Sequence, residues 1–170
     1  MLDLNSFAVE PESSSESVSL TLVVDVSGSM FEGGRRWIAR GIVREIEQYV
    51  RLGYGKANLR LVAAGAEPRE ITWNLDDDVP AAILDCQGPF DMARLLAFLK
   101  DVSGPILYVG DADWPVKATR TLGAWLAMRP EDFFRAIVLG DERPTVLRGR
   151  LFAADEVFAA LDGFLGNGDV

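Results

Sequence analysis

The feature that most limits the possible folds is a short apolar run that ends in a polar loop. Residues 18–24 read VSLTLVV, which is almost continuously apolar and rich in β-branched side chains. Such a run is typical of a strand that is buried on both faces, as in a parallel sheet. Parallel strands need long crossover connections, usually helical, so the sequence predicts a chain that alternates strands and helices.

Strand-like segments recur along the rest of the sequence. The hairpin-length link at residues 65–68 makes the two segments that flank it antiparallel. A short last strand is expected within residues 140–152, where the sequence leaves no room for a full crossover helix before it. Apolar runs and one alternating segment predict the remaining strands at residues 59–64, 69–73, 106–109 and 136–139.

Helical spacing of apolar residues completes the pattern. It predicts helices at about residues 34–52, 91–100, 116–128 and 155–165. The first helix presents Ile38, Ile42, Ile46 and Tyr49, and the last presents Val157, Phe158, Leu161, Phe164 and Leu165. The sequence therefore predicts an α/β fold: a doubly wound, mainly parallel central sheet with one antiparallel edge strand and helices on both faces.

The length predicts one domain behind an N-terminal tail. A chain of 170 residues corresponds to one domain. Residues 1–17 are polar and are interpreted as a flexible tail, which leaves residues 18–170 as a single domain. The start of the chain lacks the basic and apolar segments of a signal peptide. The one cysteine, Cys86, allows no internal disulfide and is predicted as a small buried hydrophobe, so we expect a cytoplasmic protein.

The composition excludes several classes of function. The chain has no histidine, which removes Ser-His-Asp catalysis and histidine-ligated zinc. A net charge of −9 argues against nucleic-acid binding and against docking to anionic membranes. Because histidine is absent, any metal must be held by oxygen, which favours Mg²⁺, Mn²⁺ or Ca²⁺. Three aspartates at residues 76–78 are interpreted as a solvated loop, with a second cation site or docking patch as the alternative.

Chemistry is concentrated in the loop that follows the first strand. Asp25, Ser27 and Ser29 form a D-x-S-x-S pattern, and Gly28 lets the loop turn between the two serines. One carboxylate and two hydroxyls on alternate residues can converge on a hard cation such as Mg²⁺. The alternative is an ordinary turn in which Asp25 caps the next helix.

The segment LTLVVDVSGSM resembles the first strand and metal-ion-dependent adhesion site (MIDAS) loop of von Willebrand factor A (VWA) domains. ILYVGD, ending in Asp111, is similar to another strand of that family. The resemblance implies that these strands are neighbours, so that Asp25 and Asp111 meet where connections leave in opposite directions, which is where open α/β sheets bind ligands. It also implies that Asp111 acts on the metal through water.

A second loop departs from the family pattern. The family places a ligating threonine before a helix, and alignment of that helix puts Phe90 at the threonine position. Asp91 then either supports the metal or caps the helix. Asp113 is a further candidate for a supporting role. The resemblance therefore implies a partly degenerate MIDAS that binds Mg²⁺, Mn²⁺ or Ca²⁺ weakly.

Other side chains near these motifs have two interpretations. Trp37 and Trp125 stand at helical positions and are predicted to be core residues, whereas Trp114 suits either the core or an interface on the metal face. Arg35 and Arg36 either grip a carboxylate near the site or remain solvated.

The function expected from this resemblance is protein binding without catalysis. The partner would offer an acidic residue to the metal, and a multi-protein intracellular system of bacterial type, such as one built around an AAA+ ATPase, is the setting that the family implies. The alternative is a haloacid-dehalogenase-like phosphatase with Asp25 as nucleophile and Mg²⁺ beside it. That mechanism needs a general acid where this chain has Ser27. A nucleotide-binding P-loop is a weaker alternative, because it needs a lysine followed by Ser or Thr and this loop has none.

Overall fold

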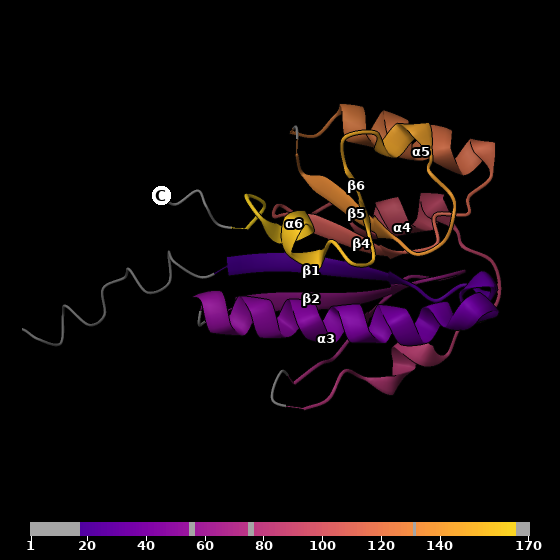
Figure 1. Ribbon diagram of the computed structural model, residues 1–170. Coiled ribbons are helices and arrows are strands. Elements are labelled where there is room, and N and C mark those ends of the chain that lie inside the picture. Colours follow the sequence, from indigo (N-terminus) through magenta and orange to yellow (C-terminus); the bar gives the residue numbers. More distant parts are fainter. Residues whose placement is uncertain (1–17, 55–56, 75–76, 131, 166–170) are drawn as a thin grey trace, which may run out of the picture.

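The computed structural model describes residues 18–54, 57–74, 77–130 and 132–165, which fold around a six-stranded sheet (Figure 1). The strand order is β3-β2-β1-β4-β5-β6, and β2 and β3 form the antiparallel pair among otherwise parallel neighbours. This confirms the predicted sheet. The predicted flexible tail, residues 1–17, lies outside the described residues. The strands are β1 (Val18–Asp25), β2 (Ala57–Ala64), β3 (Arg69–Ile71), β4 (Ile106–Gly110), β5 (Phe134–Val138) and β6 (Leu151–Ala153).

Helices cover both faces of the sheet, as Figure 1 shows. The long helix α3 and the short α6 share one apolar core with the sheet, and α4 and α5 share a second core on the opposite face. The helices are η1 (Gly28–Gly34), α3 (Arg35–Tyr54), η2 (Ala81–Leu84), α4 (Met92–Phe98), α5 (Val116–Ala127), η3 (Thr145–Leu147) and α6 (Val157–Leu161).

The almost continuous apolar pattern of β1 follows from its central place in the sheet. Leu20, Leu22 and Val24 face the core beneath α3, whereas Val23 faces the core beneath α4 and α5. Successive side chains of a strand point to opposite faces, so a strand covered on both faces favours apolar residues at most positions. β1 pairs with β2 on one side and with β4 on the other, which brings the ends of β1 and β4 together as predicted.

Two glycines set the point where α3 begins. Gly33 and Gly34 have φ angles of 62° and 71°, a left-handed conformation that glycine adopts without strain. They are the last two residues of the 3₁₀ segment η1, directly before α3, which starts at Arg35. The predicted helix at 34–52 is therefore correct, and its first residues lie directly beside the Asp25 loop.

Three predicted core residues lie at the surface instead. Trp37 is 54% exposed, Ile38 is 45% exposed and Phe158 is 59% exposed, so the prediction that each is buried is wrong. Helical spacing does not say which side chains at the margin of an apolar stripe the sheet covers. The buried face of α3 is centred on Ala39, Val43, Ile46 and Val50. Trp125, in contrast, packs against the core beside Phe133.

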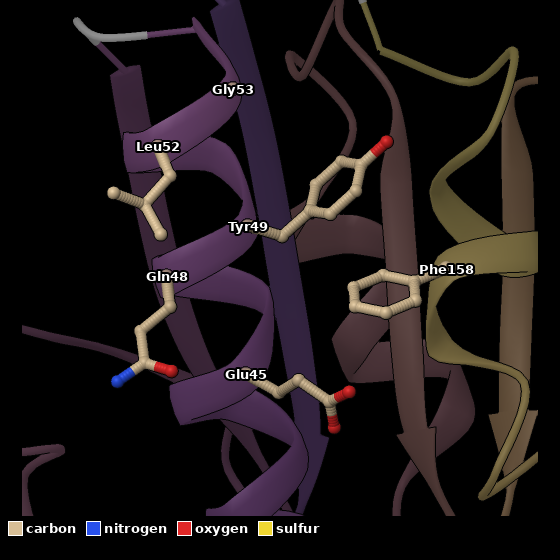
Figure 2. Close-up of a pocket in the computed structure, with 6 residues that line it drawn as sticks. All are labelled: Glu45, Gln48, Tyr49, Leu52, Gly53 and Phe158. Atoms are coloured by element: carbon tan, nitrogen blue, oxygen red, sulfur yellow. The ribbon is translucent and has the colours of Figure 1, made fainter.

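Phe158 faces a groove between α3 and α6. Figure 2 shows Tyr49 and Phe158 directed towards one another from these two helices, and their ring centroids lie 5.2 Å apart. The groove has a volume of about 580 Å³. Its lining residues are Glu45, Gln48, Tyr49, Leu52, Gly53 and Phe158.

The last connection follows the prediction for residues 140–152. β6 runs parallel to β5, and the chain between them contains the short 3₁₀ helix η3 in place of an α-helix. Leu147 of η3 is fully buried and packs in the core beside α5. Cys86 is buried as predicted. Of the helices in the described ranges, none combines the length and apolar character needed to cross a membrane.

Candidate metal centre

Asp25 is the buried centre of the predicted site. It is the last residue of β1 and is 1% exposed. Its Oδ1 accepts hydrogen bonds from the backbone N–H of Ser27 at 2.9 Å and from Ser27 Oγ at 2.6 Å. The loop therefore folds back on the carboxylate, and both partners come from the D-x-S-x-S motif itself.

The row of oxygens continues to the neighbouring strand. Ser27 Oγ lies 3.3 Å from Ser29 Oγ, and Ser29 Oγ donates to Asp111 Oδ2 at 2.5 Å. Asp111 follows β4 directly and is 2% exposed. The structure thus brings together all four predicted ligands, Asp25, Ser27, Ser29 and Asp111, at the carboxyl ends of two adjacent strands.

Tyr108 is a member of the site that sequence analysis missed. Its hydroxyl donates to Asp25 Oδ2 at 2.8 Å and accepts from the backbone N–H of Ala112 at 3.0 Å. The signal was a single hydroxyl in an otherwise apolar strand, ILYVG, where a buried tyrosine oxygen needs a partner. Gly110 makes this contact possible, because a Cβ there would overlap both the Tyr108 hydroxyl and Asp25.

Arg35 brings a positive charge to the same cluster. Its Nη1 lies 3.3 Å from Asp111 Oδ2 and 3.3 Å from the carbonyl oxygen of Ser29, to which it donates. Gly140 leaves space for this guanidinium, since a Cβ there would come within 3.1 Å of Arg35 Nη2. Of the two interpretations left open, Arg35 therefore grips a carboxylate. Arg36 instead stacks over the ring of Phe31, with 4.1 Å from Cζ to the centroid.

Burial raises the pKa of Asp25. Desolvation is the largest cause, and the nearby charge of Asp111 adds to it, whereas hydrogen bonds from Ser27 and Tyr108 favour the ionised form and lower the pKa. The resulting pKa is about 6, against an ordinary 3.8. Burial, with the charge of Asp25 as the second cause, also raises the pKa of Tyr108 well above its ordinary value, so this hydroxyl keeps its proton. Asp25 is therefore costly to ionise without a compensating cation.

The second predicted loop also lies against the site. The backbone N–H of Gly28 donates to the carbonyl oxygen of Gly88 at 2.8 Å. The backbone N–H of Gln87 donates to the carbonyl oxygen of Val26 at 2.9 Å. Phe90, at the position of the family's threonine, packs instead against Tyr108 and Trp114, with ring centroids 6.3 Å and 5.9 Å away.

The remaining candidates have more peripheral places. Asp91 caps α4, because its Oδ1 accepts from the backbone N–H of Arg94 at 3.0 Å. Asp113 is exposed, and its contact with the cluster is a backbone N–H donated to Asp111 Oδ1 at 3.2 Å. Trp114 is half-buried, and its Nε1 is buried with no hydrogen-bond partner among the described residues. The sequence left two interpretations of Asp91 open, support of the metal or capping of the helix, and the structure shows capping.

The aspartate run at residues 76–78 is held by arginines where it is described. Asp78 forms ion pairs with Arg44 and, at 3.7 Å, with Arg40. Asp76 lies outside the described residues. These contacts favour the solvated loop over a second cation site.

The donor chemistry of the Asp25 cluster fits a hard cation. The described residues contain no group of three or more histidine, cysteine, aspartate or glutamate side chains that could hold a metal ion. The cluster instead combines two carboxylates with two hydroxyls, and Mg²⁺ and Mn²⁺ accept such oxygens together with water. Arg35 competes for Asp111, and Phe90 adds no ligand. The side chains present therefore suit a weakly held cation.

Solved VWA domains share this fold. The VWA domain of SpRpn10 is 11% identical with a TM-score of 0.58, over 79% of this chain and 86% of that chain. A von Willebrand factor type A protein from Catenulispora acidiphila is 17% identical with a TM-score of 0.52, over 85% of this chain, which spans only 40% of its length. Proximal thread matrix protein 1 from the mussel byssus, with a zinc-occupied MIDAS motif, is 10% identical with a TM-score of 0.52, over 86% of this chain and 45% of that one.

These likenesses establish that the chain has a VWA fold, as its sequence predicted. No protein-family profile matches the sequence, and no curated protein matches it either.

Proposed function

We propose that this chain is a protein-interaction module that holds a divalent cation on Asp25, Ser27, Ser29 and Asp111 and presents it to an acidic side chain of a partner protein. The observation that carries the proposal is the continuous row of four side-chain oxygens, with steps of 2.6, 3.3 and 2.5 Å, at the switch point of the sheet. Open α/β sheets bind their ligands at such points.

The coordination of the cation explains the kind of partner. Asp25, Ser27 and Ser29 supply at most three close oxygens, and Asp111 acts through water in the family that the chain resembles. An octahedral cation then keeps exchangeable waters on its outer side. A glutamate or aspartate of the partner can replace one of them, and contacts between full charges are among the stronger polar interactions.

Electrostatics favours a contact that depends on the cation. The net charge of −9 repels an acidic partner at long range, so attraction has to arise locally, within one Debye length of about 8–10 Å. Loss of the cation should therefore weaken binding more than folding, because the two apolar cores do not include the four proposed ligands.

The proposal includes the absence of catalysis. Asp25 would have to be the nucleophile of a phosphatase, but both its oxygens are engaged by Ser27 and Tyr108. Ser27 stands where an acid would be needed and cannot serve as one near neutral pH. We expect no turnover of p-nitrophenyl phosphate with Mg²⁺. Turnover that Asp25→Asn abolishes would contradict this part.

The cellular setting is also a proposal. The single cysteine of the chain is buried, which suits a cytoplasmic protein, and the VWA fold suits a component of a multi-protein system such as one built around an AAA+ ATPase.

Titration with Mn²⁺ followed by electron paramagnetic resonance tests the cation site. We expect saturable binding with a Kd on the order of 1 mM, or about 4 kcal/mol. Asp25→Ala and Ser27→Ala should abolish it. Asp113→Asn, which removes an exposed carboxylate two residues from Asp111, should leave it unchanged. Binding that survives Asp25→Ala would place the cation elsewhere.

Two further readouts probe the ligand set. Affinity for Mn²⁺ should fall as the pH drops below about 6, because protons then compete for Asp25. Solvent relaxation of the Mn²⁺ complex should decrease when a glutamate-containing peptide replaces bound water, and a glutamine-containing peptide is the matched control. Equal effects of the two peptides would contradict the acidic partner.

A further inference from the structure

A cleft rich in arginine lies at the amino ends of β5 and β6. It has a volume of about 370 Å³. Asp132 stands just before β5 and Arg150 just before β6, so the cleft is at the opposite end of the strands from Asp25 and Asp111. Its lining residues are Asp132, Arg135, Arg148, Gly149 and Arg150.

Arg135 is a fixed wall of this cleft. Its Nε and Nη2 donate to the two carboxylate oxygens of Asp132, each at 2.9 Å. Its Nη1 donates to the carbonyl oxygens of Ala160 at 2.8 Å and Asp162 at 2.9 Å, at the end of α6. The side chain is only 13% exposed and lies over the ring of Phe164. The charge of Asp132 is therefore neutralised by Arg135, and these hydrogen bonds hold Arg135 in place.

Arg148 and Arg150 add charge that no described acid neutralises. The ion pairs of residues 18–54, 57–74, 77–130 and 132–165 include neither of these side chains. Arg148 is exposed, and Arg150 donates to the carbonyl oxygen of Phe134 at 3.3 Å. Gly149, with φ 81°, forms the turn between them.

The sheet register places these arginines together. Ala136 of β5 pairs with Leu151 of β6, so Arg135 and Arg150 occupy neighbouring positions one residue earlier on each strand. Alternation along the strands gives them the same face, that of Ile137 and Phe152, which belongs to the core beneath α3 and α6. Three guanidinium groups and one carboxylate thus meet in one cleft of a protein whose net charge is −9.

We propose that this cleft binds an oxyanion of the phosphate class. A carboxylate pairs best with one guanidinium through two parallel hydrogen bonds, and Asp132 already makes that arrangement with Arg135. A phosphate carries more charge and more oxygens, so it can accept from Arg148 and Arg150 at once. The site is separate from the cation site and does not depend on it.

The probe for this site is inorganic phosphate, titrated at constant ionic strength with chloride as the balancing anion. Shifts of the Gly149 amide and of the arginine Nε–H signals in ¹H–¹⁵N spectra report the binding. We expect saturable shifts for the wild-type chain, and at least about tenfold weaker binding for the double variant Arg148→Gln/Arg150→Gln. Arg120→Gln, which removes an exposed arginine on α5, is the control with unchanged binding.

Two parallel titrations identify the ligand chemistry. Acetate should bind more weakly than phosphate, and equal or tighter binding of acetate would overturn the phosphate assignment. O-phosphoserine tests whether an esterified phosphate, as on a modified protein, also enters the cleft. Saturable binding of either phosphate compound that requires Arg148 and Arg150 supports the proposal. No saturable shift with either compound, or equal affinity in the double variant, would overturn it. Circular dichroism confirms that the variants remain folded.

Discussion

The two ends of the sheet collect opposite charges in different ways. At the carboxyl end, Asp25 and Asp111 are buried, 1% and 2% exposed, and the surrounding hydroxyls hold them in place. At the amino end, Arg148 is exposed, Arg150 is half-buried and donates to the carbonyl oxygen of Phe134, and Arg135 is held by several hydrogen bonds. Burial makes a charge costly unless it is paired, whereas an exposed charge costs little. Changes at the carboxyl end should therefore alter stability, and a change to the exposed Arg148 should alter binding alone.

The largest effect is expected at Gly110, where the backbone leaves no space. Gly110→Ala places a Cβ on top of the Tyr108 hydroxyl and Asp25, so it should lower the free energy of unfolding by about 3–5 kcal/mol. Gly41→Ala is the control. Gly41 lies within α3 with open space around it, so alanine there should stabilise the protein by about 0.5–1 kcal/mol. Urea denaturation of both variants measures the difference, and equal stability would contradict the crowding at the carboxyl end.

The second effect separates the arginines at the amino end. Arg135→Gln leaves Asp132 and the carbonyl oxygens at the end of α6 without their donor, so it should cost about 2–4 kcal/mol. Hydrogen exchange should show the loss first in α6 and β6. A variant as stable as wild type would mean that Arg135, like Arg148, is available to a ligand.

The third predicted effect is a rise in the free energy of unfolding, where the first two are losses. The pKa of Asp25 is about 6 in the folded chain, above its ordinary 3.8. Its contribution to stability is therefore full below about pH 3.8 and is lost as the pH rises through 6, at a cost of up to about 3 kcal/mol. In chelator at pH 8, Asp25→Asn should raise the free energy of unfolding by about 1–2 kcal/mol, since the amide keeps part of the hydrogen bonding. At pH 4 the gain should vanish. A destabilised variant at pH 8 would show that Asp25 is already compensated.

The smallest effect is expected for Arg148. Arg148→Gln removes an exposed side chain without an ion pair among the described residues, so the free energy of unfolding should change by less than about 0.5 kcal/mol. Thermal unfolding in chloride buffer measures it. A larger loss would assign Arg148 a structural role and make it unsuitable as a ligand-binding residue.

Prediction from sequence succeeded where one local pattern decided the outcome. The apolar run of β1 indicated a strand that is buried on both faces of the sheet. The D-x-S-x-S spacing then showed which side-chain oxygens lie at the end of that strand. The neighbouring place of Asp111 rested on the resemblance to VWA domains, since strand order is not a local property. The structure confirmed it through the pairing of β1 with β4.

Contacts between distant segments escaped the sequence. Tyr108 was hidden inside an apolar strand, and its bond to Asp25 depends on Gly110 leaving space. Gly140 also leaves room for the contact of Arg35 with Asp111, but a Cβ there would meet only the end of a flexible side chain. Phe158 carried the right helical spacing, yet it faces the groove in Figure 2 and not the sheet. The spacing of apolar residues shows which face of a helix is buried, but it does not show how much of that face the sheet covers.

The most direct test of the cation site is the stability of the chain as a function of Mn²⁺ at pH 8. Above the Kd, a cation that binds only the folded wild-type chain raises its free energy of unfolding by about 1.4 kcal/mol for each tenfold increase in concentration. In chelator, the free energy of unfolding of Asp25→Asn should be higher than that of the wild type, and it should not change with Mn²⁺. The wild-type value rises with Mn²⁺, so the difference between the two shrinks, and it reverses once the gain from binding exceeds the advantage of the variant. Parallel or equally flat curves would contradict a cation held by Asp25, Ser27, Ser29 and Asp111.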